Sequence, residues 1–245
     1  MEREKVNVIG IVFDNYTKKE FIQFFLERIN KKEKTFVVTA NPEIVMFAKN
    51  NPFYYKIIKK ANYVVPDGVG VIKGAQLLGS PLAERVPGFE LMLALLQEAN
   101  LNQLRVYFLG AKQEVVEKAV AQVRKDYPLI QIAGYHDGYF DLKDKKMINE
   151  VQGTQPDIVF VALGFPKQEK WISQYLETAE KGILMGVGGS FDVLSGNARR
   201  APKFFLDHNI EWFYRLLKQP SRFGRMMALP RFLVEVYKQK IRTKR

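Results

Sequence analysis

The stretch ANYVVPDGVG, residues 61–70, places a short apolar run directly before a proline, an aspartate and a glycine. An apolar run of this length that is closed by Pro and Gly is typical of a buried strand whose carboxyl end opens onto a crevice. In open parallel α/β sheets, ligands bind in such crevices. Asp67 is therefore a candidate catalytic base. An aspartate in a strand-to-helix turn is equally typical of an N-cap, so Asp67 could instead cap the helix expected from about Gly70.

Apolar runs alternate with amphipathic segments on both sides of this stretch. Strands are predicted at residues 6–13, 35–40, 63–65, 106–109, 129–133, 157–163 and 182–187. Helices are predicted at residues 17–30, from 42 onward, and at 70–78, 89–98, 113–125, 141–151 and 167–176. Thr17 is the expected N-cap of the first helix. This alternation predicts an α/β fold, with a mostly parallel Rossmann-like sheet covered by helices on both faces.

The last 50 residues have a different pattern. They carry 13 Lys and Arg and three acidic residues, and hence most of the net charge of +12. Two helices are predicted, at 204–218 and 223–240, and both mix large apolar side chains with basic ones, a pattern that fits packing on the body, on a partner or on a bilayer surface. We therefore expect a catalytic core at 1–195 and a basic helical, membrane-docking appendage at 196–245. The charge alone also fits nucleic acid or a phosphorylated ligand.

The composition narrows the class of protein. The chain has 245 residues, 47% of them hydrophobic, which is typical of a globular protein. It has no cysteine and only two histidines, which excludes disulfides and thiolate metal sites and argues against a histidine-built one. A charged N-terminus without a signal-like apolar segment, and no apolar window of membrane-spanning length, predict cytoplasmic residence.

A glycine-rich loop, GVGGSFD at 186–192, follows the last predicted strand. It lacks the third glycine of the dinucleotide fingerprint, and the chain has no P-loop motif, so a nicotinamide enzyme and an ordinary P-loop NTPase are disfavoured. A loop with Gly186, Gly188 and Gly189 can still let the backbone approach a diphosphate, with Asp192 available to a ribose or base. A purely structural tight turn is the alternative.

Other polar residues are expected at the same crevice. Thr39 and Asn41 end the second strand and suit hydrogen bonds to sugar hydroxyls, although Asn41 could simply cap the next helix. Arg85 lies in a rigid loop where it could bind a phosphate bidentately, or form a surface ion pair with the neighbouring glutamate. Gln168 lies in the first turn of a helix and is expected to face the crevice, with a solvated helix start as the alternative.

No carboxylate pair with the spacing of a metal-binding DxD motif is present. A glycoside hydrolase would need a matched acid and base, and no second acid is singled out by its spacing. Arg215, Arg222 and Arg225 of the tail could supply the positive charge that a metal ion would otherwise bring. No metal and no other cofactor is expected.

Taken together, these motifs resemble the WecG/TagA/CpsF family of bacterial glycosyltransferases. The resemblance spans nearly the whole chain. It rests on TANPEIVM at 39–46, VPDGVGV at 65–71, ERVPGFELM at 84–92, YFLGA at 107–111, GYF at 138–140, VALGFPKQEKWI at 161–172, GVGGSFDVLSGNARRAP at 186–202 and EWFYRLLKQPSRFGRMMALP at 211–230.

The resemblance implies roles for the candidate residues. Asp67 matches the base of the family. Thr39, Asn41, Arg85 and Gln168 match polar residues of the family's pocket. Arg215, Arg222 and Arg225 match the arginines that are thought to close over the diphosphate at the membrane.

The resemblance also implies a reaction. It is the transfer of N-acetylmannosamine (ManNAc) from UDP-ManNAc to the 4-hydroxyl of N-acetylglucosamine (GlcNAc) on undecaprenyl diphosphate, with inversion and without a metal, in wall teichoic acid synthesis. Other members use an acidic ManNAc derivative or build capsular polysaccharide. The implied partners are a UDP-sugar, the lipid-linked acceptor and the anionic inner face of the plasma membrane, and a homodimer is left open. A nucleic-acid-binding module and an epimerase are the rival classes.

Overall fold

The chain is built on a six-stranded parallel sheet. The computed structural model describes residues 3–198, 201–202, 204–205, 214 and 227–243. The strands are β3 (Lys34–Ala40), β4 (Tyr63–Pro66), β5 (Arg105–Gly110), β6 (Gln131–His136), β7 (Ile158–Ala162) and β8 (Gly182–Gly186). Their order across the sheet is β4-β3-β8-β7-β5-β6, and every neighbouring pair is parallel.

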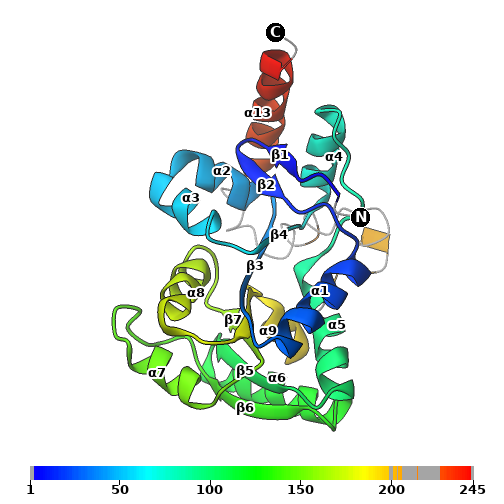
Figure 1. Ribbon diagram of the computed structural model, residues 1–245. Helices are drawn as coiled ribbons and strands as arrows, with labels where there is room; N and C mark the ends of the chain where they lie inside the picture. The colour runs from blue at the N-terminus through cyan, green and yellow to red at the C-terminus, as the bar shows by residue number, and fades with distance from the viewer. Residues whose placement is uncertain (1–2, 199–200, 203, 206–213, 215–226, 244–245) are drawn as a thin grey trace.

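Helices cover both faces of this sheet. One face packs against α1 (Lys18–Asn30), α5 (Gly88–Leu101), α6 (Gln113–Asp126) and α9 (Ser190–Leu194). The other packs against α2 (Pro42–Asn50), α3 (Pro52–Ile58), α4 (Val69–Leu77), α7 (Lys146–Gly153) and α8 (Lys167–Thr178). In Figure 1, α2, α3 and α8 lie to the left of β3, and α1 and α5 lie to its right.

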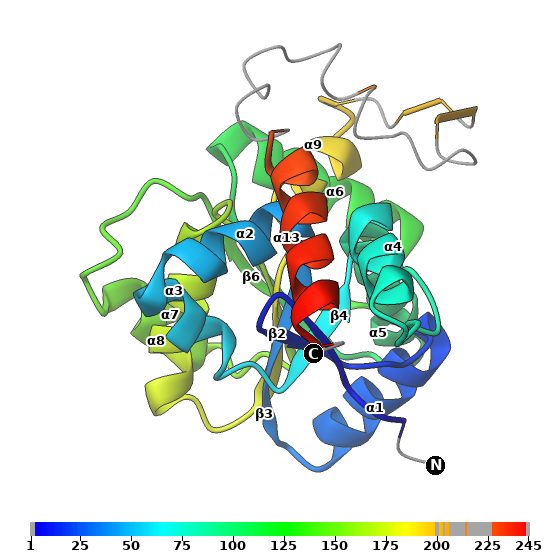
Figure 2. The same cartoon turned by 90° about the horizontal axis from the view of Figure 1, so that it is seen from above.

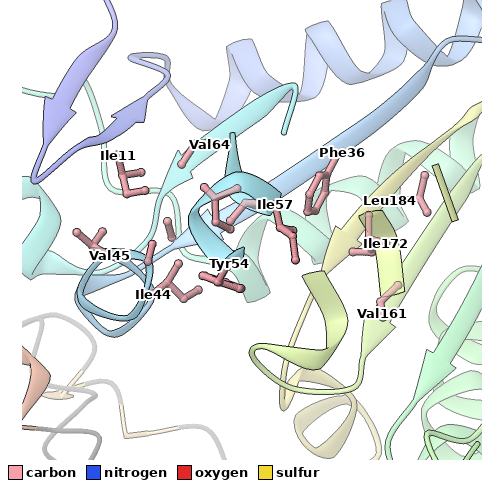
Figure 3. Close-up of a cluster of buried hydrophobic side chains, with 14 of the residues drawn as sticks. Ile11, Phe36, Ile44, Val45, Tyr54, Ile57, Val64, Val161, Ile172 and Leu184 are labelled. Carbon is pink, nitrogen blue, oxygen red and sulfur yellow. The ribbon is translucent and has the colours of Figure 1, made fainter. Parts of the chain in front are cut away.

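Each face of the sheet has its own apolar core, because successive residues of a strand point to opposite faces. In β3, Phe36 and Val38 belong to one buried cluster and Val37 to the other. Figure 3 shows part of the first cluster, in which Tyr54 and Ile57 of α3 lie with Phe36 and with Ile172 of α8. The predicted Rossmann-like α/β fold with two covered faces is confirmed.

The N-terminal strand prediction was wrong. Residues 6–13 form two short antiparallel strands, β1 (Val6–Val8) and β2 (Ile11–Phe13), in a separate two-stranded sheet. The chain reverses at Ile9 and Gly10, which both have positive φ, 53° and 85°. Such a turn is the usual connection of a tight hairpin, and glycine adopts it without steric cost.

Other predictions also differ from the structure. Strand β6 covers Gln131–His136 where 129–133 was predicted, and two further differences have local reasons. The helix expected from residue 141 begins only at Lys146, because the carboxylates of Asp141 and Asp144 accept hydrogen bonds from backbone amides two residues ahead, at 2.9 and 2.8 Å. Such bonds favour turns over helix. Helix α3 was not predicted, although Asn51 caps it ahead of a proline, as Asn41 does for α2. The expected N-cap of α1, Thr17, is confirmed and forms a capping box.

The last helix, α13 (Ala228–Thr243), packs on the body of the protein. Phe232 and Val236 are fully buried and join the core cluster that contains α2 and α4. Figure 2 shows α13 between α2 and α4, over the β1–β2 hairpin, and the Gln239 side chain accepts a hydrogen bond from the amide of Ile9 at 2.7 Å. The predicted helix at 204–218 and the start of the second predicted tail helix lie largely outside the described residues.

Two glycines of α4 allow this close packing. A Cβ on Gly74 would lie 2.9 Å from the Phe232 ring, and one on Gly70 would lie 2.8 Å from Leu229. Gly70 therefore serves the contact with α13. In the described part of the chain, no helix combines the length and the apolar composition needed to cross a bilayer. The predicted domain boundary at residue 195 stays a prediction, and α13 shares its core with the body.

Candidate active site

The predicted site residues that the structure describes lie at or near the carboxyl edge of the sheet. Ala40 at the end of β3 pairs with Pro66 at the end of β4, and Val161 of β7 pairs with Gly186 at the end of β8. Because the strands are parallel, the loops that follow them emerge at one edge, where α/β proteins bind ligands. The loop of Asp67 and the glycine-rich loop flank β3 from opposite sides, since both β4 and β8 border that strand.

Asp67 is half-buried directly after β4. Its amide donates to the carbonyl of Ala40 at 3.0 Å, and its Oδ2 accepts from the amide of Gly88 at 3.4 Å. The N-cap of α4 is Gly68, with φ 97° and no side-chain capping bond, so the alternative in which Asp67 caps that helix was wrong. The carboxylate instead faces the first residue of α5, whose N-terminus favours a negative charge.

Gly88 joins Thr39 to this carboxylate, and the sequence analysis missed it. A Cβ on Gly88 would lie 2.9 Å from Thr39 Oγ1, so the start of α5 rests against the threonine. Thr39 and Asp67 therefore contact the same residue from two neighbouring strands. In the sequence, the only signal for this contact is that Gly88 follows a proline at the start of a predicted helix.

Asn41 follows β3 at the start of α2, and Arg85 lies in the loop before α5. Asn41 caps α2, because its Oδ1 accepts from the amide of Ile44 at 3.0 Å, so the capping alternative is confirmed for this residue. Arg85 is half-buried in the loop before α5, and the neighbouring Val86 amide donates to Pro66 at 2.9 Å, which ties that loop to the end of β4. The substrate roles of both residues stay predictions.

The buried side chain of Gln168 contacts the glycine-rich loop at Gly186 and Gly188. Its side chain is 5% exposed, so the solvated-start alternative was wrong. Its Oε1 accepts from the Gly188 amide at 3.1 Å, and a Cβ on Gly186 would lie 2.4 Å from its Nε2. Gly186 therefore has no room for a side chain, and Gly188 has a φ of 52°, a backbone conformation that favours glycine.

The exposed Gly189 is the glycine of this loop that remains for the approach of a diphosphate. Asp192 is half-buried in α9, with Oδ2 3.6 Å from the position of a Cβ on Gly189. The nucleotide-binding roles of the loop and of Asp192 stay predictions. The three predicted tail arginines, Arg215, Arg222 and Arg225, lie outside the described residues.

Glu169 is a buried acid that the sequence analysis did not single out. It is 2% exposed, and burial raises its pKa to about 7. Its Oε1 accepts from Gln168 Nε2 at 2.8 Å. An acid in the first turn of a helix is usually solvated, so nothing in the sequence pattern distinguished it. Within the described ranges, no three His, Asp or Glu side chains cluster as metal ligands would.

A Rossmann-like sheet that brings a carboxylate, an amide and a glycine-rich loop to its carboxyl edge defines an α/β protein with a candidate ligand site at that edge. The family within that class comes from comparison with known proteins. Residues 6–245 match the glycosyl transferase WecG/TagA/CpsF family, and the chain belongs to it. It is therefore a glycosyltransferase, and this membership sets aside the nucleic-acid-binding module and the epimerase.

Its relatives include enzymes with a stated substrate. It is 41% identical over 98% of its length, and 95% of theirs, to the N-acetylglucosaminyldiphosphoundecaprenol N-acetyl-beta-D-mannosaminyltransferases of Staphylococcus aureus strains MW2 and NCTC 8325. A Bacillus spizizenii protein of the same name is 42% identical over 86% of this chain and 81% of its own.

Proposed function

We propose that this protein transfers ManNAc from UDP-ManNAc to the 4-hydroxyl of GlcNAc on undecaprenyl diphosphate, as in the linkage unit of wall teichoic acid. The proposal is supported by nearly full-length similarity to transferases named for this acceptor and this sugar. Among the structural observations, the position of Asp67 carries it. A half-buried carboxylate lies at the carboxyl edge of the sheet, where it accepts from the Gly88 amide at the start of α5.

In the proposed reaction, Asp67 accepts the proton of the acceptor hydroxyl as its oxygen forms a bond to the anomeric carbon of ManNAc. The bond from that carbon to the β-phosphate oxygen of UDP breaks on the opposite side of the sugar ring. One positioned base is sufficient for such a single displacement, which inverts the anomeric configuration. Neither step requires a second carboxylate.

The leaving diphosphate needs positive charge or amide donors. The exposed Gly189 end of the glycine-rich loop is proposed to lie against it, and the Asp67 loop is separated from β8 by two strand spacings, roughly 10 Å. A single nucleotide-sugar can span that distance. We propose that Arg215, Arg222 and Arg225 complete the site and stabilise the developing charge without a metal ion.

The docking surface is proposed to be the outer face of α13. Leu233, Val234, Tyr237 and Ile241 are exposed there, between 41% and 64%, among the basic residues of the tail. Each basic residue near an anionic leaflet contributes about 1 kcal/mol. The tail would thus hold the enzyme at the inner face of the plasma membrane, next to its lipid-linked acceptor.

The donor sugar is tested by measuring UDP release from a panel of UDP-sugars with a lipid-linked GlcNAc acceptor. We expect release with UDP-ManNAc and little with UDP-GlcNAc, UDP-GalNAc or the uronic acid of ManNAc. Release with the uronic acid alone would instead support the alternative of a same-family transferase with another donor. Omission of the acceptor is the control for simple hydrolysis.

A further inference from the structure

Two adjacent buried polar side chains, Gln168 and Glu169, lie behind the glycine-rich loop at the start of α8. They are 5% and 2% exposed, in a protein whose other polar side chains are mostly at the surface. Buried polar groups are costly unless they are bonded, and a buried charge costs more. The burial of these two polar side chains therefore calls for a reason beyond packing.

The two side chains form a short relay of hydrogen bonds. The Gly188 amide donates to Gln168 Oε1 at 3.1 Å, and Gln168 Nε2 donates to Glu169 Oε1 at 2.8 Å. A glutamine amide has an acceptor at one end and a donor at the other. Because Oε1 of Glu169 accepts from the donor end of the amide, Glu169 selects the orientation in which the amide oxygen faces Gly188.

The reversed orientation would break both bonds. It would turn the amide NH₂ toward the donating amide of Gly188, and the amide oxygen toward the carboxylate oxygen. The side chain also has little room to move, because Gly186 lies against it so closely that a Cβ there would be 2.4 Å from Nε2 and 2.8 Å from Cδ. The glycine-rich loop and the Gln168 side-chain amide therefore hold each other in place, and Glu169 determines which end of the amide faces Gly188.

The carboxyl group of Glu169 is buried and also interacts with the side chain of Tyr54. The Tyr54 hydroxyl, on α3, lies near it: burial and then the Glu169 charge raise the pKa of Tyr54. The charge of Glu43, on α2, also raises the pKa of Tyr54. Burial raises the pKa of Glu169, so its ionised form is costly and the residue is a poor choice for stability alone.

We propose that Glu169 is a positioning residue for donor binding. By orienting the Gln168 amide, it holds the turn at Gly188 and Gly189 in the conformation that receives the diphosphate of a nucleotide-sugar. This inference rests on the proposed function for its ligand. The relay itself is a property of the free protein and can be measured without any ligand.

The test compares Glu169→Gln, which keeps an acceptor oxygen in the same place, with Glu169→Leu, which does not. In the full-length protein, hydrogen exchange of the Gly188 amide is followed by NMR, and UDP binding is followed by calorimetry. We expect Glu169→Leu to lose protection of Gly188 and to bind UDP about tenfold more weakly, the equivalent of one hydrogen bond. Glu169→Gln should retain both properties.

A swapped pair covers the case in which Glu169→Leu does not fold. Gln168→Glu alone places two carboxylates against each other and should weaken UDP binding. Adding Glu169→Gln to it recreates both bonds, since the new carboxylate accepts from Gly188 and from the new amide. We expect the double variant to regain Gly188 protection and UDP affinity.

The outcomes separate the relay from the proposed function. Unchanged Gly188 protection in Glu169→Leu, or no recovery in the swapped pair, would overturn the relay. Loss of protection with unchanged UDP affinity would overturn the role of Glu169 in donor binding. A wild-type protein that binds no UDP would contradict the proposed function, and the Gly188 exchange would still decide the relay.

Discussion

At the residue scale, the site depends on two glycines that lie so close to polar side chains that no larger residue would fit. Gly88 donates to Asp67 Oδ2 at 3.4 Å and at the same time borders Thr39, and Gly186 borders the Gln168 amide. Neither glycine has a positive φ. Their small size, and not their conformational freedom, explains them, because each lies where a Cβ would collide with a polar side chain of the site.

Gly88→Ala tests the contact that joins Thr39 to the Asp67 carboxylate. The added methyl group would lie 2.9 Å from Thr39 Oγ1, so the threonine or the start of α5 must shift. We expect kcat to fall by about tenfold or more, since an ångström-scale displacement of a catalytic group is costly, with a stability loss of roughly 1–3 kcal/mol. Steady-state kinetics and urea denaturation provide the measurements.

Gly153→Ala is the matched control, because nothing lies within 4 Å of a Cβ at that position. It should leave kcat and stability close to the wild-type values. A Gly88→Ala enzyme as active as this control would show that the contact does not position the site.

The buried carboxyl of Glu169 predicts a pH dependence of stability. Burial raises its pKa from 4.5 to about 7, so between these pH values the folded protein keeps a proton that the unfolded chain has lost. The stability that the proton provides is present below pH 4.5 and is lost as the pH rises through about 7. The loss is on the order of 3 kcal/mol.

Glu169→Gln removes this titration, so the difference in unfolding free energy between variant and wild type should grow from pH 5 to pH 8. Urea denaturation at both values measures it. Parallel pH profiles of the two proteins would show that Glu169 does not titrate in this range.

At the scale of the elements, the sequence predicted what local patterns encode. The capping box of α1 and the apolar runs of β3, β4, β5, β7 and β8 were placed within a residue or two. The hairpin at Ile9 and Gly10 was missed because its strands continue one apolar run. Packing on the body was one of three surfaces that the tail pattern allowed, and the structure selects it for α13 through close contacts at Gly70 and Gly74 of a distant helix. Periodicity shows which face of α13 is apolar, but not what covers it.

The outer face of α13 is tested by Val234→Ser together with Tyr237→Ser, two side chains that are 54% and 64% exposed. Phe53→Ser on α3, 65% exposed, is the matched control for loss of a surface apolar group. Removing two apolar side chains from a membrane interface costs on the order of 2 kcal/mol or more, so binding should fall at least about tenfold. Sedimentation with vesicles rich in phosphatidylglycerol measures it.

Equal sedimentation of the double variant and the wild type would contradict a docking role for this face. Substitutions are preferable to deletion of residues 196–245, because Phe232 and Val236 belong to the core.

At the scale of the whole molecule, the chain joins a two-faced α/β body to a basic tail whose last helix packs against it. The position of the candidate site at the carboxyl edge followed from the alternation of strands and helices, which predicted a parallel sheet. The contacts among the site residues could not be predicted in this way. Gln168 contacts Gly186 and Gly188 because β7 and β8 are neighbours in the sheet. Sequence motifs located these residues, whereas the structure showed that they support one another.

The central claim is that Asp67 is the base of an inverting transfer, and Asp67→Asn tests it most directly. Asparagine keeps an oxygen that can accept from Gly88, so the local fold should persist while the proton acceptor is lost. UDP binding by calorimetry and ManNAc transfer to lipid-linked GlcNAc are measured on the same preparation. We predict near-wild-type UDP affinity with transfer reduced by about 10²-fold or more. Transfer at close to the wild-type rate would contradict the account.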